Sequence, residues 1–261
     1  MLKQFTNYKG EKQNIDFSLA FNENQGASDR TNNKYIVAHS TATPNAPAKN
    51  IATYMRNNWN KVWSYVHFAI DDTSCYAIGE QGYVAWGAGP SANLNSPVQV
   101  ELCEFTDKTR AMNAYKNYVN FLRDASKDTG ISIDNIKTHK WFSNTFHESD
   151  HTDPDTYLAT LGISDVQFRK DLQTGFSSQN SGGNSGQSGQ AGQTALGKFK
   201  VNIGLATYAK ADLSKVTGRI SPGTTVEYTQ KLVGTTYTWL KLKDGNYIQA
   251  VVNEKKNGTF I

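Results

Sequence analysis

Histidine and carboxylate side chains gather in one short stretch of the sequence. Residues 139–153 contain three carboxylates and three histidines, His139, His147 and His151. Neutral imidazoles together with a carboxylate or thiolate suit a tetrahedral zinc site, and a catalytic site keeps one position open for water. The stretch therefore favours a metal centre. A polar surface loop is the alternative, because neither an HExxH nor a CxxC pattern is present.

The other two histidines belong to apolar runs. His39 directly follows residues 34–38, a short apolar run typical of a strand, so this run delivers the imidazole at its end. His67 lies in the middle of a second such run, residues 65–70. A histidine in the middle of a strand, taken by itself, is more typical of packing than of metal ligation.

The elements that must position these residues alternate between strand and helix patterns. Strands are predicted at 34–38, 65–70 and 98–103, and helices at 48–58, 109–128 and 164–172. The helix at 109–128 has the clearest apolar stripe, with Gly130 as its C-cap, and a capping box begins at Ser164. This order of elements predicts a layered α/β domain.

A segment without charged residues divides the chain. Residues 174–196 are mostly Gly, Ser, Gln and Asn, which predicts a flexible linker between domains at 1–173 and 197–261. The C-terminal domain has short runs rich in Val, Thr, Tyr and Ile at 199–203, 225–232, 237–243 and 247–252, separated by turn residues. It has no convincing helix, so a small all-β barrel is predicted.

Charge is distributed unevenly between the two parts. Residues 197–261 carry ten basic and four acidic side chains, whereas the rest of the chain has a net charge of −2. A basic module suits an anionic surface such as a cell wall. Its basic residues are spread along the module rather than clustered, which disfavours nucleic acid. No apolar run is long enough for a membrane span, and Met1–Asn22 lacks the apolar core of a Sec-type signal peptide.

Six segments, in this order, resemble zinc N-acetylmuramoyl-L-alanine amidases, which are related to peptidoglycan recognition proteins. They read YIVAHSTATP, WSYVHFAIDD, YVAWGAG, VQVELCEF, IKTHKWFSN and HESDHTDPDTYLATLGIS, and they cover residues 35–173. The set is most similar to phage endolysins and Gram-positive autolysins. The resemblance implies a central mixed sheet flanked by helices. It also implies hydrolysis of the amide bond between N-acetylmuramic acid and L-alanine of the stem peptide.

The resemblance also implies a zinc ligand set. His39 and His139 match the two histidine ligands, and Asp153, just before a proline, matches the third ligand. The gap between His139 and Asp153 is longer than in many relatives. His147 or His151 is therefore the alternative third ligand.

Further positions match residues that act on the substrate. Glu101 matches the acid or base that handles the zinc-bound water, with Glu104 as its local competitor. His151 matches the cation that faces the reacting carbonyl. Three residues are assigned to the substrate groove: Trp86, Asn93 and His67.

The C-terminal domain resembles the bacterial SH3-like wall-binding domains that follow endolysin catalytic domains. The whole chain is therefore expected to be a monomeric endolysin that is released from the host cytoplasm, through a holin, to bacterial peptidoglycan. The alternatives are a host autolysin, a catalytically silent peptidoglycan-binding protein and a peptidase that uses Cys75 or Cys103. The last is disfavoured, because neither cysteine lies in a Cys-Gly or Cys-Trp helix-start context. The two cysteines could also pair with each other.

Overall fold

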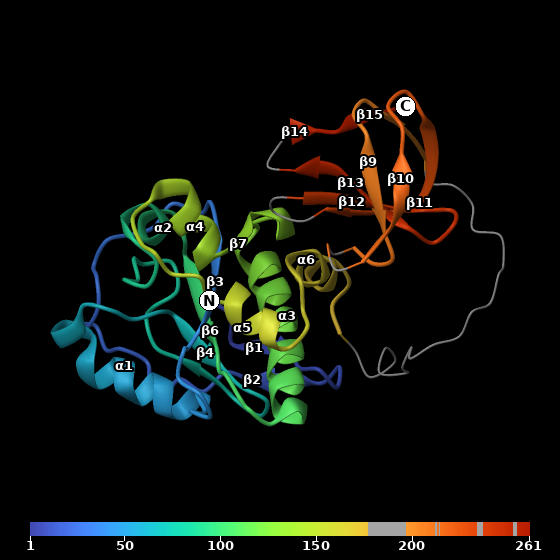
Figure 1. Cartoon of the computed structure of the whole chain (residues 1–261). Helices are drawn as coiled ribbons and strands as arrows, with labels where there is room; N and C mark the ends of the chain where they lie inside the picture. The colour runs from blue at the N-terminus through green and yellow to red at the C-terminus, as the bar shows by residue number, and fades with distance from the viewer. Residues whose placement is uncertain (177–196, 212, 214, 234–236, 253–254) are drawn as a thin grey trace. The chain divides into compact units, whose positions relative to one another are not determined.

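The computed structural model describes the chain except for residues 177–196, 212, 214, 234–236 and 253–254 (Figure 1). The chain divides into two compact units, whose main parts are Met1–Ile163 and the strands that begin at Gly197. Most of the predicted linker, 174–196, lies outside the described residues. Among the described residues, no helix has the length and apolar character of a membrane span.

The first unit is built on a five-stranded mixed sheet in the order β5-β4-β6-β3-β7. The strands are β3 (Ile36–Ser40), β4 (Phe68–Ile70), β5 (Cys75–Ala77), β6 (Val98–Leu102) and β7 (Ile136–Thr138). Only β5 runs antiparallel to its neighbour. Because β3 is buried along its whole length, its sequence is an almost continuous apolar run. The predicted α/β class with a central mixed sheet is confirmed.

Helices cover both faces of this sheet (Figure 1). The helices of the chain are α1 (Ala48–Val62), α2 (Pro90–Asn95), α3 (Lys108–Thr129), the 3-10 turn η1 (Ile133–Asn135), α4 (His139–Phe146), α5 (Asp155–Thr160) and α6 (Asp165–Thr174). Of these, α1, α3 and α4 make the main contacts with the strands of this sheet. On one face, Phe121 of α3 contacts Phe68 of β4. On the other, α2 and α4 pack on Val37 of β3, through a cluster that includes Phe142. Successive residues of a strand point to opposite faces, which gives the first unit its layers.

The long helix α3 has the ends that its sequence predicts. The Asp107 side chain accepts a hydrogen bond from the Arg110 backbone N–H, and Gly130 ends the helix with a φ of 74°. A residue without a Cβ adopts this left-handed conformation at little cost, which is why glycine is preferred there. Both ends of α3 therefore follow from local sequence.

Two short segments at the ends of the first unit pack on α3. The hairpin of β1 (Gln4–Thr6) and β2 (Lys12–Asn14) was not predicted, since its strands have three residues each. At the other end, Phe176 exchanges two hydrogen bonds of 2.7 Å with the side chain of Asn120. The folded part of the first unit therefore extends at least three residues beyond the predicted boundary at 173.

The second unit is an all-β domain, as predicted. Its eight strands form one antiparallel sheet in the order β10-β9-β13-β12-β11-β8-β15, with β14 paired to β13. They are β8 (Gly197–Val201), β9 (Leu205–Tyr208), β10 (Val216–Ile220), β11 (Thr225–Val233), β12 (Tyr237–Leu242), β13 (Tyr247–Val252), β14 (Lys255–Lys256) and β15 (Gly258–Phe260). Phe199, Leu240 and Ile248 are among its fully buried core residues. This arrangement is consistent with an SH3-like domain.

Candidate metal centre

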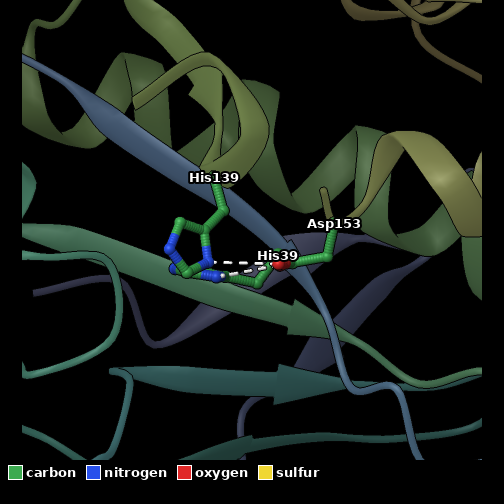
Figure 2. Close-up of side chains that lie close together, drawn as sticks. All are labelled: His39, His139 and Asp153. Carbon is green, nitrogen blue, oxygen red and sulfur yellow. Dashed lines mark hydrogen bonds and ion pairs between the residues drawn. The ribbon is translucent and has the colours of Figure 1, made fainter. Parts of the chain in front are cut away.

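Three side chains from distant parts of the sequence converge at one point of the first unit (Figure 2). His39 Nδ1 lies 3.1 Å from Asp153 Oδ2, and His139 Nδ1 lies 3.1 Å from Asp153 Oδ1. One potential ligand atom from each residue lies within 4.8 Å of the other two. Both rings turn the same nitrogen toward the carboxylate. The structure thus brings together the three ligands that the sequence predicts.

The parallel pairing of β3 with β7 places the two histidines. Ala38 pairs with Thr138, so His39 and His139 follow paired residues at the carboxyl ends of neighbouring strands. Thr138 also caps α4, since its hydroxyl accepts a hydrogen bond from the Trp141 backbone N–H. His139 is therefore the first residue of a helix, and its ring lies 4.8 Å from that of His39 between centroids.

Hydrogen bonds hold the loop that carries Asp153. The carboxylate of Glu148 accepts bonds of 2.7 Å from both the backbone N–H and the hydroxyl of Ser91, at the start of α2. Further along the loop, the Asp153 carbonyl accepts a bond from the Lys140 N–H at 3.0 Å. These hydrogen bonds hold the long loop between His139 and Asp153 so that the Asp153 carboxylate lies beside both histidines.

The charges at this point suit a metal cation. Burial by itself raises the pKa of Asp153, but the imidazole groups of His139 and His39 that face its carboxylate outweigh burial and hold that pKa well below its usual range. Burial also lowers the pKa of His139. A neutral imidazole beside an ionised carboxylate is the form in which both residues bind zinc. The donor set therefore fits a zinc ion.

Glu101 lies next to this cluster and has an unused oxygen. Its Oε2 atom is buried and has no hydrogen-bond partner among the described residues. Burial, reinforced by the charges of Asp153 and Glu104, raises the pKa of Glu101 well above its usual value. Glu104, the predicted competitor, is engaged otherwise: its Oε1 accepts bonds from the Ser40 hydroxyl and the Ala42 N–H. The geometry thus favours Glu101 as the proton-handling residue.

The two histidines of the loop differ in position. His151 stacks on His139 with 4.5 Å between ring centroids, and its side chain is 61% exposed. Its Nδ1 lies 3.4 Å from Asp153 Oδ1, so it borders the cluster on the solvent side. His147 ends α4 and is exposed. Among the described residues the three-ligand group contains Asp153 and neither of these histidines.

The structure places His67, predicted for the substrate groove, in the interior of the first unit. Its side chain is fully buried, and both ring nitrogens bond to the main chain: Nδ1 accepts from the Gln99 N–H and Nε2 donates to the Tyr83 carbonyl. Burial lowers the pKa of His67 to about 4. These bonds and the burial are those of a packed histidine.

The other two groove residues lie close to the cluster. Trp86 is half-buried and contacts the ring of Trp63, with 5.1 Å between centroids. Asn93 Oδ1 accepts hydrogen bonds from the backbone N–H groups of Gly87 and Ala88, which follow Trp86 in the chain. Contact of either side chain with a substrate stays a prediction.

The sequence reading missed two residues that bond to the outer nitrogens of the histidines. Gln99 Oε1 lies 3.2 Å from His39 Nε2, and Ser149 Oγ lies 3.0 Å from His139 Nε2. The only sequence signal for Gln99 is its position two residues before Glu101, which places both on one face of β6. Nothing in the sequence alone distinguishes Ser149 from an ordinary polar loop residue.

Both cysteines lack the features of a nucleophile. Cys75 and Cys103 are buried, and neither forms a disulfide. Burial, with the nearby charge of Asp71, raises the pKa of both thiols. A reactive cysteine needs the thiolate form, so the structure also disfavours a peptidase that uses Cys75 or Cys103.

Comparison with known proteins points to one family. Residues 29–156 match the family of N-acetylmuramoyl-L-alanine amidases. The endolysin of Listeria phage A511 is 34% identical over 57% of this chain and 46% of its own length. The lytic amidase of Streptococcus pneumoniae phage HB-3 is 29% identical over 56% of this chain and 48% of its own length. The chain thus spans about half the length of these relatives.

A solved structure agrees at the level of the fold. The Staphylococcus aureus hydrolase AmiA, in complex with its ligand, superposes with a TM-score of 0.54 and 20% identity, over 61% of this chain and 82% of that chain. The region that matches the family model contains β3, β6, β7 and all three candidate ligands. The first unit of this chain is therefore a domain of the N-acetylmuramoyl-L-alanine amidase family.

Proposed function

We propose that this protein is a peptidoglycan hydrolase of the phage endolysin type. It cleaves the amide bond between N-acetylmuramic acid and the L-alanine of the stem peptide. The observation that carries the proposal is the convergence of His39, His139 and Asp153 beside the unpartnered Oε2 of Glu101, within a domain of the amidase family. The relatives that are named endolysin and lytic amidase support the phage type.

Zinc is the proposed cofactor, held by His39, His139 and Asp153. Bound zinc lowers the pKa of water toward neutrality and polarises a carbonyl group, which is the chemistry that an inert amide requires. The protein contributes two imidazoles and one carboxylate, with Glu101 beside them. Three protein ligands with one open position are typical of catalytic zinc sites.

Glu101 and His151 handle protons and charge in this proposal. Glu101 Oε2 accepts a proton from the attacking water and returns it to the leaving nitrogen of L-alanine, as a general base and then a general acid. His151 is exposed beside Asp153, where its ring donates a hydrogen bond to the substrate carbonyl oxygen as negative charge develops on it.

The second unit supplies affinity for the wall. The unit has six more basic than acidic residues, and the exposed Lys198 and Lys200 alternate on β8 with the buried Phe199. Lysines on the outer face of a sheet suit an anionic, sugar-rich polymer. The partner is therefore bacterial peptidoglycan or a linked wall polymer, and the protein acts on the wall as a monomer.

Mass analysis of fragments released from purified cell wall tests the proposal. An amidase releases stem peptides with a free L-alanine amino terminus and leaves the glycan strands intact. The Glu101→Gln protein serves as the control for non-enzymatic release. New reducing sugar ends, or new amino groups on other residues, would assign a different bond. Wall binding and zinc binding without any release would identify a silent peptidoglycan-binding protein.

A further inference from the structure

Gln99 occupies a buried position beside the first candidate ligand. It lies on β6, where it pairs with Val37 of β3, and its side chain is fully buried. Val37 and His39 are two residues apart on one strand, so Gln99 and the His39 ring share a face of the sheet. The 3.2 Å contact between Gln99 Oε1 and His39 Nε2 follows from this placement.

The surroundings of Gln99 determine which end of its amide faces His39. Gln99 Nε2 donates to the Ala85 carbonyl and to Asn93 Oδ1, each at 3.1 Å. Both partners are oxygens that only accept. Asn93 Oδ1 is itself held by the N–H groups of Gly87 and Ala88. The amide nitrogen of Gln99 is thus committed, and its oxygen is left to face the imidazole.

An amide oxygen accepts a hydrogen bond and donates none. His39 Nε2 must therefore carry a hydrogen, and in the neutral ring Nδ1 then carries a lone pair. That lone pair faces Asp153 Oδ2 at 3.1 Å, so two acceptors meet unless a cation lies between them. The arrangement prepares Nδ1, rather than Nε2, as the ligand atom.

Gly87 makes this approach possible. A Cβ atom at position 87 would lie 2.4 Å from Gln99 Oε1 and 3.4 Å from His39 Nε2. Any side chain there would displace the amide oxygen from the imidazole. Glycine at position 87 therefore allows the Gln99 side chain to lie close to the backbone. It is not required there by an unusual φ angle.

We infer that Gln99, oriented by Asn93, is a positioning residue that fixes His39 in the tautomer with hydrogen on Nε2 and lone pair on Nδ1. This inference rests on the proposed zinc site. Partners of the second ring nitrogen orient metal-binding histidines, and their loss typically lowers metal affinity about 10–100-fold. Ser149 has no equivalent effect on His139, since a hydroxyl both donates and accepts.

Ring-nitrogen NMR of the full-length protein, loaded with zinc so that a cation lies between His39 Nδ1 and Asp153, tests the tautomer directly. With ¹⁵N-labelled histidine and a pH at which the rings are neutral, the wild-type His39 signal, assigned by its loss in His39→Asn, is expected to show hydrogen on Nε2. Gln99→Met keeps the length of the side chain and removes the acceptor, so a mixture of tautomers is expected. Hydrogen on Nδ1 in the wild-type protein would overturn the inference, even if no Gln99 variant folds.

Zinc affinity, measured by competition with a chromophoric chelator, provides the second readout. Gln99→Met is expected to bind zinc about 10–100-fold more weakly. Gln4→Met, at an exposed position of β1, is the matched control and is expected to retain wild-type affinity. A folded Gln99→Met protein with one Nε2–H tautomer and unchanged affinity would contradict the inference. Absence of zinc binding by the wild-type protein would instead refute the proposed metal site.

Discussion

Glu101 lies directly opposite His39 in the parallel pairing of β3 with β6. Side chains of paired residues in parallel strands project from the same face, about 5 Å apart at the backbone. The Glu101 carboxyl group, whose Oε2 has no hydrogen-bond partner among the described residues, therefore lies next to the His39 imidazole. One backbone pairing thus joins the proposed proton carrier to the proposed metal site.

Replacing Glu101 tests this relationship. Glu101→Gln keeps the shape and removes the titrating group, so we expect zinc binding to be retained and turnover on purified wall to fall about 10²–10³-fold. Glu104→Gln is the comparison, because its oxygen still accepts from Ser40 and Ala42, and a much smaller loss is expected. Near wild-type turnover by Glu101→Gln would refute the proton-transfer role.

The third ligand is tested by removing the carboxylate that both histidines face. Asp153→Ala is expected to lose stoichiometric zinc and all measurable amidase activity, because only two imidazoles remain. Zinc content after gel filtration, measured by atomic absorption, checks this. Asp150→Asn changes a carboxylate of the same loop that is exposed and outside the cluster, and it should retain zinc. Full occupancy in Asp153→Ala would transfer the ligand role to His151.

Buried His67 makes the stability of the first unit depend on pH. The folded-state pKa of His67 is about 4, below the value of about 6.5 for an unfolded chain. The contribution of neutral His67 to the free energy of unfolding is therefore fully present above pH 6.5 and is lost as the pH falls through 4. The total loss is about 3 kcal/mol.

Urea unfolding of metal-free protein, followed by tryptophan fluorescence, measures this loss between pH 7.5 and pH 4. His67→Gln retains an acceptor and a donor for the Gln99 N–H and the Tyr83 carbonyl but does not titrate. The free energy of unfolding of this variant should fall less with acid than that of the wild type. Equal pH dependence of the two proteins would exclude His67 as the cause.

The exposed ring of Trp63 is expected to contact the glycan. Trp63 is 67% exposed, lies on Trp86 and has a φ of 51°, which is unfavourable for a bulky residue. Trp63→Gly removes the ring and suits this backbone conformation. We expect wall affinity to fall about three- to tenfold with no loss of folding stability. Trp63→Tyr keeps an aromatic face and should bind nearly as well; unchanged affinity of the glycine variant in sedimentation assays would exclude the contact.

Truncation tests the proposal that the first unit carries the catalytic activity and the second unit the wall affinity. A protein that ends at Phe176 keeps the bonds to Asn120 and should cleave soluble muropeptide at the full-length rate. It should lyse intact cells much more slowly, because loss of the second unit lowers the effective concentration on the wall. Salt should weaken wall binding of the isolated second unit. Equal lysis by both proteins in low salt would contradict this division.

The sequence by itself determined the long elements and the three residues proposed as metal ligands. The apolar run before His39 and the apolar stripe of α3 are strong sequence signals, because a buried strand and a half-buried helix each impose a pattern on many residues. His39, His139 and Asp153 were identified through six ordered segments that resemble one family. Short elements such as β1 and β2 were missed, because three residues are too few to show a period.

Only the tertiary structure decided how these residues are used. His67 and His39 both belong to apolar runs, yet one is enclosed with both nitrogens bonded to the main chain and the other faces Asp153. Gln99 acquires its partner because β6 and β3 pair in one register, a contact between residues 60 positions apart. Local pattern reports whether a side chain is buried, whereas its bonding partner depends on which strands become neighbours.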